Sequence, residues 1–150
     1  MATFRPAAEK DLPAIIRLLA DDELGATRED PSEPLNSRYI AAFNAIQSDT
    51  NQLMLVAEHN AVVIGCLQLT FIPGLTRLGM WRGQIEGVRI AKTERGSGLG
   101  RQMFDYAIEQ CRNRGCELVQ LTTDAQRPDA HGFYEALGFQ PTHIGMKLKL

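Results

Sequence analysis

The stretch RGSGLG, residues 95–100, places three glycines at every second position beside one arginine, directly before the amphipathic segment QMFDYAIEQC. The first N–H groups of a helix have no partner within it, and together with the helix dipole they attract an anion, usually a phosphate. Glycines remove Cβ atoms that would obstruct the anion and allow positive φ where a turn needs it. The stretch therefore predicts a phosphate-binding turn, with Arg95 and Arg101 as cations beside it.

The glycine spacing separates this turn from two common nucleotide-binding patterns. Neither GxGxxG nor GxxxxGK[ST] fits. The turn also does not follow the first strand, where a dinucleotide-binding fold would place it. A flexible loop with a glycine cap is the alternative to a phosphate site.

The segment QIEGVRI, which precedes the turn, carries a break in its strand pattern. Val88 and Ile90 fall on one face, but Ile85 lies three residues from Val88, so the alternation slips at Glu86-Gly87. One extra residue at that point is typical of a β-bulge, and glycine suits such a position. A bulge would splay this strand from the neighbouring ELVQLTT, and the carboxylate of Glu86 would then be able to point into the gap.

Hydrophobic periodicity predicts the elements that must position these residues. The predicted strands are Thr3–Arg5, Leu53–Glu58, Val62–Ile72, about 79–91, Glu117–Thr123 and about Thr142–Leu150. The predicted helices follow Asp11, run from about Ser37 to Gln47, follow the glycine-rich turn and begin at Pro128, whereas residues 21–34 are predicted to be a loop. The order predicts an α/β (α+β) fold. Its sheet would be mixed and mostly antiparallel, with one splayed parallel pair and helices on both faces.

Length and composition suit one domain over residues 1–150. A net charge of −2 argues against a general nucleic-acid binder, which needs a concentrated cationic face. No apolar run approaches the ~20 residues of a membrane span, and the N-terminal residues lack a secretory pattern. Cys66, Cys111 and Cys116 show no zinc spacing, which predicts reduced thiols in a cytoplasmic protein. The three histidines do not suggest a metal site.

Two motifs together resemble those of a known family. RGSGLG follows VRI and matches an R/Q-x-x-G-x-G/A pyrophosphate loop, and FYEALGF, residues 133–139, matches a late helix-to-strand signature. In these motifs and in its element order from Thr3 to Leu150, the chain is similar to the GNAT superfamily of acyl-CoA-dependent N-acetyltransferases. The resemblance implies acetyl-CoA as the donor, with its pyrophosphate on the turn and its pantetheine arm along the strand edge. The residues thereby implied in cofactor binding are Val88, Arg89, Ile90, Arg95, Gly96, Ser97, Gly98, Leu99, Gly100 and Arg101.

Acetyl transfer to an amine requires loss of a proton from the ammonium, donors for the oxyanion and a proton for the leaving thiolate. Glu86 is the candidate base, with a solvated glutamate, Gln84 or a water chain as alternatives. The Val88 amide is the candidate oxyanion donor. The resemblance makes Tyr134 the candidate acid for the CoA sulfur, and a core aromatic is its alternative role.

The chain departs from the family pattern before its late helix. Relatives often carry an asparagine there that contacts the pantetheine, but this sequence has Arg127 at that position. Asp124 or Gln126 would then replace the asparagine, or Arg127 would reach a CoA phosphate.

The acceptor is left open by conflicting charges. Residues 21–34 are acidic and would attract a cationic amine, whereas Arg77 and Arg82 would favour an acidic substrate. The function hypothesis is an N-acetyltransferase that moves acetyl from acetyl-CoA to a primary amine of a small molecule by direct attack in a ternary complex. The alternatives are a protein N-terminal or lysine acetyltransferase and a non-catalytic CoA-binding sensor. Because many members of the superfamily pair, a homodimer is a further expectation.

Overall fold

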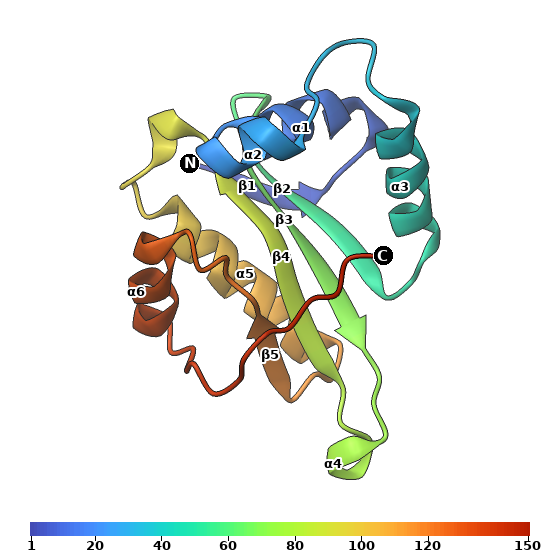
Figure 1. Ribbon diagram of the computed structural model, residues 1–150, viewed down its shortest axis with the longest axis vertical. Coiled ribbons are helices and arrows are strands. Elements are labelled where there is room, and N and C mark those ends of the chain that lie inside the picture. Colours follow the sequence, from blue (N-terminus) through green and yellow to red (C-terminus); the bar gives the residue numbers. More distant parts are fainter.

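The computed structural model describes the backbone of residues 1–150 and every side chain except that of Pro128. At its centre is a five-stranded sheet in the order β1-β2-β3-β4-β5 (Figure 1). The strands are β1 (Thr3–Pro6), β2 (Gln52–His59), β3 (Val62–Ile72), β4 (Arg82–Ile90) and β5 (Leu118–Leu121). The helices are α1 (Leu12–Ala20), α2 (Glu23–Arg28), α3 (Ser37–Ser48), α4 (Thr76–Gly79), α5 (Leu99–Asn113) and α6 (Pro128–Ala136), with single 3₁₀ turns at Glu9–Asp11 and Lys92–Glu94.

The sheet is mixed, as the order of elements predicts. β1 to β4 pair as antiparallel neighbours, and β4 and β5 are parallel because α5 carries the chain back along the sheet. Asn60 and Ala61 join β2 to β3 with φ of 49° and 63°, the left-handed conformation that a tight hairpin requires. The α/β (α+β) prediction is confirmed.

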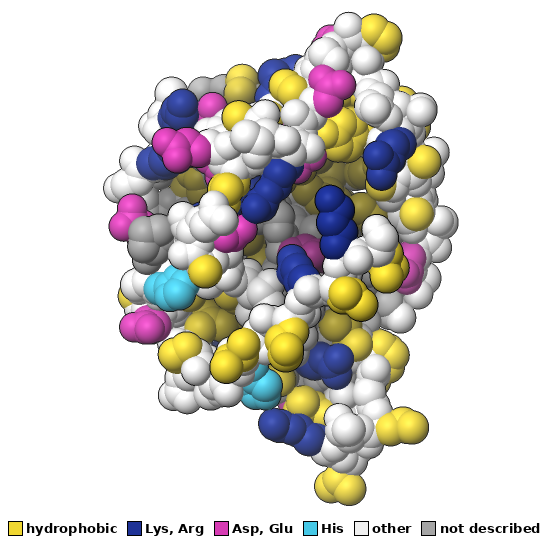
Figure 2. Space-filling view, in the orientation of Figure 1, with side chains coloured by type: hydrophobic (Ala, Val, Ile, Leu, Met, Phe, Trp, Pro, Cys, Tyr) yellow, Lys and Arg dark blue, Asp and Glu magenta, His cyan; other side chains and the backbone are white. Residues whose placement is uncertain are grey.

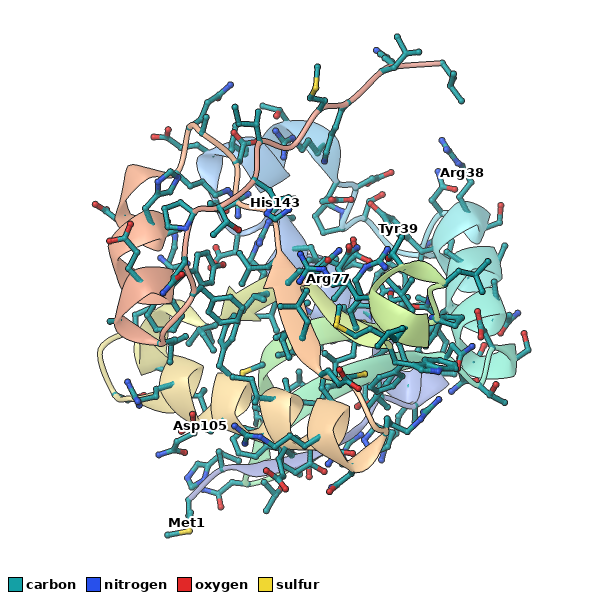
Figure 3. All side chains as sticks on the ribbon, turned by 90° about the horizontal axis from the view of Figure 1, so that it is seen from below. Met1, Arg38, Tyr39, Arg77, Asp105 and His143 are labelled. Carbon is teal, nitrogen blue, oxygen red and sulfur yellow. The ribbon has the colours of Figure 1, made fainter. Side chains whose placement is uncertain are left out.

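Helices cover both faces of the sheet, which also confirms the prediction. α5 packs on one face through Met103, Phe104 and Ala107, all fully buried. α1 and α3 pack on the other face through Ile16 and Phe43. In Figure 1 α5 lies behind the sheet and α1 with α2 in front of it, and Figure 3, turned by 90°, shows α5 and the α1–α2 pair on opposite sides of the sheet. Each buried side chain of this size contributes about 1.5–3 kcal/mol relative to exposure, so the two clusters hold the central strands firmly.

Residues 21–34 are not a loop throughout, which corrects the sequence prediction. Asp22 caps α2 by accepting a hydrogen bond from the Gly25 N–H at 2.5 Å. α2 is only six residues long and buries only its glycine among the residues it contains. Such a helix has no apolar period, so periodicity did not reveal it.

Two predicted strands are shorter in the structure. The strand predicted over about 79–91 begins at Arg82, because the residues before it form the turn α4, in which Arg77 and Leu78 have φ of 55° and 61°. The strand predicted over Glu117–Thr123 is reduced to Leu118–Leu121, and Leu118 is 39% exposed rather than buried. β5 lies at the edge of the sheet and loses its partner after Leu121.

The segment Thr142–Leu150 is not a strand of the sheet, which corrects the prediction of a final strand. It forms no ladder with the strands that the structure describes, and Figure 3 shows the chain leaving the body of the molecule beyond His143. Its apolar side chains are almost wholly exposed: Ile144 91%, Met146 90%, Leu148 85% and Leu150 111%. The alternation of apolar residues is a local signal, whereas a strand also needs a hydrogen-bonded neighbour, and in the described residues this segment pairs with none of the five strands.

None of the helices in the described part of the chain combines the length and the apolarity that crossing a bilayer requires.

Candidate active site

β4 and β5 separate at the position where the sequence predicts a gap. Their pairing ends at Ile85 opposite Leu121. Directly beyond it, Gln68 of β3 pairs with Glu86 but Cys66 pairs with Arg89, so two residues of β4 lie opposite one residue of β3. Gly87 is one of the two, with a φ of 63° that favours glycine. The predicted bulge is confirmed, and the space between the strands beyond Ile85 and Leu121 is called the splay below.

The two faces of β4 carry different chemistry at the splay. Val88 and Ile90 pack against the core under α5. Glu86 and Arg89 pair with Gln68 and Cys66, whose side chains belong to the opposite face, so both point toward the side of α1 and α2. Glu86 is exposed, and its carboxylate is therefore available to solvent or to a bound molecule. Its position agrees with the predicted role but does not test it.

Polar side chains continue along this face below Glu86. Gln120 donates a hydrogen bond from Nε2 to Oε1 of Gln84 at 3.0 Å, bridging β4 and β5 where the splay begins. On the neighbouring strands, Gln68 and Thr70 both donate to Oε1 of Gln52. The Gln84 side chain is thus held in place by Gln120. This contact suits a residue that lines the site better than one that takes a proton from the substrate.

The glycine-rich turn connects the 3₁₀ turn Lys92–Glu94 to α5. Gly96 and Gly98 have φ of 81° and 87°, and a Cβ built on either would meet no atom of the described residues within 4 Å. The Ser97 hydroxyl closes the turn by donating to the Glu94 carbonyl at 2.6 Å. Gly98 is the N-cap of α5 and offers no side-chain cap. The Leu99 N–H donates to the Ser97 hydroxyl at 3.4 Å, whereas the amides of Gly100 and Arg101 have no hydrogen-bond partner among the described residues. Arg95 and Arg101 are exposed beside them.

Gly100 differs from the other two glycines of the turn. A Cβ at this position would lie 3.3 Å from the Phe133 ring of α6. The missing side chain of Gly100 therefore also lets α5 and α6 pack closely, and the predicted place of its amide in the cofactor site stays a prediction.

Tyr134 lies in an aromatic cluster on α6. Its ring centroid is 5.6 Å from that of Phe104, 5.5 Å from that of Phe133 and 6.2 Å from that of Phe139. Burial raises the pKa of its phenol above the ordinary value of 10.0, although the positive charges of Arg127 and Arg89 oppose this. The phenol therefore stays protonated at neutral pH and can donate a proton. The ring of Tyr134 takes part in the packing predicted as its alternative role, and its role as the acid stays a prediction.

An ion cluster near Tyr134 was not foreseen as a unit. Oδ2 of Asp22, the N-cap of α2, lies 3.0 Å from Nη2 of Arg127 and 3.7 Å from Nε of Arg89. A second bridge joins Arg28 of α2 to Asp124 at 2.9 Å. The departure at Arg127 from the family pattern was the one signal in the sequence, but its partner on α2 depends on the tertiary fold.

The thiols and histidines do not form a reactive centre. Burial raises the pKa of Cys66 to about 12 and that of Cys111 to about 11, so both remain protonated and unreactive. Among the described side chains, no group of three or more His, Cys, Asp or Glu residues is arranged to hold a metal ion.

Two hollows lie near the segment between β4 and α5. One of about 670 Å³ lies between α1 and the β2–β3 hairpin and reaches residues 91–93. The other, of about 310 Å³, is lined in part by Ser97 and Gln102. The aromatic cluster around Tyr134 lines neither.

A parallel strand pair that splays at a bulge, followed by a glycine-rich turn at a helix N-terminus, defines the class of this protein. Residues 13–139 match the sequence profile of the acetyltransferase (GNAT) family. The chain belongs to this family, and its domain is that of an acyltransferase.

Individual relatives extend the comparison. Over 102 residues the chain is 33% identical to the aminoalkylphosphonate N-acetyltransferase of Salmonella typhimurium, covering 68% of this chain and 66% of that enzyme's length. It is 34% identical to the glucosamine 6-phosphate N-acetyltransferase of Trypanosoma brucei brucei, over 98% of this chain and 95% of the relative. A crystal structure from Bacillus halodurans C-125, described as a transcriptional regulator, superposes over the whole of both chains with a TM-score of 0.97 at 47% identity.

Proposed function

We propose that this protein transfers the acetyl group of acetyl-CoA to a primary amine of a small molecule, by direct attack in a ternary complex. The observation that carries the proposal is the splay itself. It opens between β4 and β5 directly before the turn at residues 95–101, so a thioester can enter while its diphosphate rests on the turn. Family members use acetyl-CoA. The two enzymes named above act, by their names, on small amines that carry a phosphonate or a phosphate.

Cofactor binding is assigned to the turn and to the strand edge. The free N–H groups at the start of α5 would hold the diphosphate, with Arg95 and Arg101 as cations beside it. The backbone of Val88 and Ile90 would bind the pantetheine arm as an added strand, because β5 no longer covers that edge beyond Leu121.

The transfer step then uses three groups at the splay. Glu86 takes the proton of the ammonium, directly or through water, and the amine nitrogen attacks the thioester carbon. The Val88 amide donates to the oxyanion that forms. The carbon–sulfur bond breaks as Tyr134 supplies a proton to the CoA sulfur, and the second proton, which the nitrogen loses as the amide forms, returns to the Tyr134 oxygen through water. Holding amine and thioester together contributes much of the remaining acceleration.

A non-catalytic acyl-CoA sensor is the second candidate. The description of the Bacillus halodurans relative as a transcriptional regulator favours it. A sensor would need the turn at residues 95–101 but not the phenol of Tyr134.

The decisive experiment is an assay of CoA release from acetyl-CoA with a panel of amines, with the acetylated product identified by mass spectrometry. The proposal expects release that depends on a small primary amine. Calorimetric binding of acetyl-CoA without release for any amine would support the sensor instead, and turnover only with peptides would favour a protein acetyltransferase.

We also propose that the protein, as one domain in the cytoplasm, works as a homodimer. The support is the exposed segment after Gln140, whose alternating apolar residues are suited to pair with a sheet edge. β5 has such an edge, since it pairs only with β4 among the strands that the structure describes.

A further inference from the structure

Asp22, Arg89 and Arg127 reach the splay from three separate elements. Asp22 precedes α2, Arg89 follows the bulge of β4, and Arg127 precedes α6. The three side chains are mostly buried, with exposed fractions of 30%, 18% and 26%. Figure 2 looks onto this face and shows Lys and Arg side chains gathered around its middle.

The two arginines and one aspartate of the cluster together carry a net charge of +1. Oδ2 of Asp22 faces both guanidinium groups, and its Oδ1 is already occupied by the Gly25 N–H. The nearby bridge between Arg28 and Asp124 is neutral in itself and adds no negative charge to the cluster. Two arginines thus share one carboxylate in a place of limited solvent access, where charges interact strongly.

Several donors of the two arginines have no partner among the described residues. A guanidinium has five N–H donors. Arg89 donates from Nη1 to the Val88 carbonyl at 2.8 Å, and Arg127 uses Nη2 toward Asp22. The Nε of each is buried without a hydrogen-bond partner among the described residues. An unsatisfied buried donor on a charged group is costly, and a bound anion would satisfy the cluster.

The cluster lies close enough to Glu86 for one acceptor molecule to contact both. Arg89 and Glu86 lie on the same face of β4, three residues apart, and a strand rises ~3.3 Å per residue, so their Cα atoms are at most about 10 Å apart. The positive charges of Arg89 and Arg127 also act on the pKa of Tyr134, which places them near the reacting groups. A short molecule would therefore span the distance between Glu86 and the two arginines.

We propose that Arg89 and Arg127 bind an anionic group, a carboxylate or a phosphate, on the amine that is acetylated. The inference rests on the proposed acetyl transfer, with the amine end at Glu86 and the anionic end at the arginines. Planar guanidinium groups suit such oxyanions because they donate two parallel hydrogen bonds. Asp22 holds both arginines in place when the acceptor is absent.

The test compares three acceptors of similar size: β-alanine, O-phosphoethanolamine and ethanolamine, which lacks the anion. The wild-type enzyme should prefer one of the charged amines over ethanolamine in kcat/KM by about 10- to 100-fold, as expected for hydrogen bonds to a charged group. Arg127→Gln should abolish most of this preference, and Arg127→Lys should restore part of it. Arg112→Gln, an exposed arginine paired with Glu109 at the far end of α5, is the matched control and should keep the full preference.

The two charged amines separate the sources of the anion, because the preferred one shows whether the site takes a carboxylate or a phosphate. A preference that persists in Arg127→Gln, or equal kcat/KM for charged and neutral amines in the wild type, would overturn the proposal and leave a structural ion cluster. Weaker binding of CoA to Arg127→Gln would overturn it too, since Arg127 would then serve the cofactor.

A binding measurement keeps this inference distinct from the proposed reaction. Inorganic phosphate and propionate are each titrated by calorimetry into the CoA-bound protein. At least one of the two anions should bind the wild type, and it should bind Arg127→Gln about 10-fold more weakly. That result would support the anion site even if no amine were acetylated. Absence of binding by either anion would count against the site.

Discussion

At the scale of single residues, Tyr134 combines packing and chemistry. Its ring is part of the aromatic cluster with Phe104, Phe133 and Phe139, and its phenol has a raised pKa because of burial. The sequence motif identified the residue, but only its burial in the fold explains why the proton is retained, against the opposing charges of Arg127 and Arg89. The proposed acid is therefore a residue that the fold also needs for its shape.

Tyr134→Phe should lower kcat by about 100-fold, because the ring is kept and only the proton donor is lost. Acetyl-CoA binding should stay close to that of the wild type. Since the raised pKa keeps the phenol protonated up to at least pH 10, the wild-type kcat should fall above that pH and the variant should lack this decline. Tyr106→Phe, at a half-buried tyrosine beside Phe4, is the control. An unchanged kcat in Tyr134→Phe would remove it as the acid.

Substitutions at Gly98 and Gly115 allow a test of the glycine-rich turn, because they separate the effect of backbone strain on stability from the effect on acetyl-CoA binding. Both have positive φ, 87° and 80°, and both have open space where a Cβ would go. Replacing either with alanine should destabilise the fold by a similar amount, about 1–2 kcal/mol, because each would force a left-handed alanine. Only Gly98→Ala should weaken acetyl-CoA binding measured by calorimetry. Equal affinity in the two variants would contradict the diphosphate site.

At the scale of elements, a network of charged side chains joins β1, α1 and β2. Arg5 of β1 donates to both carboxylate oxygens of Asp11, at 2.7 and 3.0 Å, and also bonds Glu58 of β2. Asp11 is only 5% exposed and further accepts the Ala8 N–H at 2.8 Å. Its paired, bidentate geometry is the kind that contributes measurably to stability. The network fixes the start of α1, and α2, whose N-cap is Asp22, follows α1 directly in the chain.

Asp11→Asn should therefore destabilise the protein by about 2 kcal/mol at neutral pH, after allowance for the partly exposed Arg5. The hydrogen bond from Arg5 is the main cause that lowers the pKa of Asp11 below 3.8 in the folded state. The stabilisation by this carboxylate is thus present above about pH 4 and is lost as the pH falls further. Denaturant unfolding at pH 7 and pH 3 should show a smaller difference between variant and wild type at the lower pH, and a difference that grows on acidification would contradict the account.

At the scale of the whole molecule, the exposed segment after Gln140 supports the proposed homodimer. Four exposed apolar residues alternate along it without a strand beside them in the described chain. A monomer would leave this surface in water, whereas a second copy could pair each segment with the edge of β5. The same strand exchanged in both directions would give a symmetric dimer.

Light scattering with size-exclusion chromatography should show a dimer for the wild type. Ile144→Lys combined with Leu148→Lys should give a folded monomer, because the apolar side of the segment is removed while the sheet core is untouched. Lys147→Gln combined with Lys149→Gln changes only the other side and should remain dimeric. A monomeric wild type, or dimers for all three proteins, would contradict the proposal.

Local patterns predicted most of the fold and the glycine turn. Period-two and helical spacing located the strands and the long helices, and the slip at Glu86-Gly87 located the bulge, because each signal lies within a few consecutive residues. Periodicity missed α2, which is short and capped by an acidic residue. It also predicted a strand after Thr142, because alternation does not tell whether a neighbour exists.

The mixed sheet, the turn at residues 95–101 and the membership of an acetyltransferase family could all be predicted from the residues alone, since each depends on short-range spacing of glycines and apolar residues. Which distant charges meet depends on how the helices and strands pack. The cluster shows this, because its members Asp22, Arg89 and Arg127 are far apart along the chain. In the folded protein both arginine side chains lie within 4 Å of the Asp22 carboxylate. Ion pairs and strand pairs each need a partner group from another part of the chain, and folding is what brings that partner close.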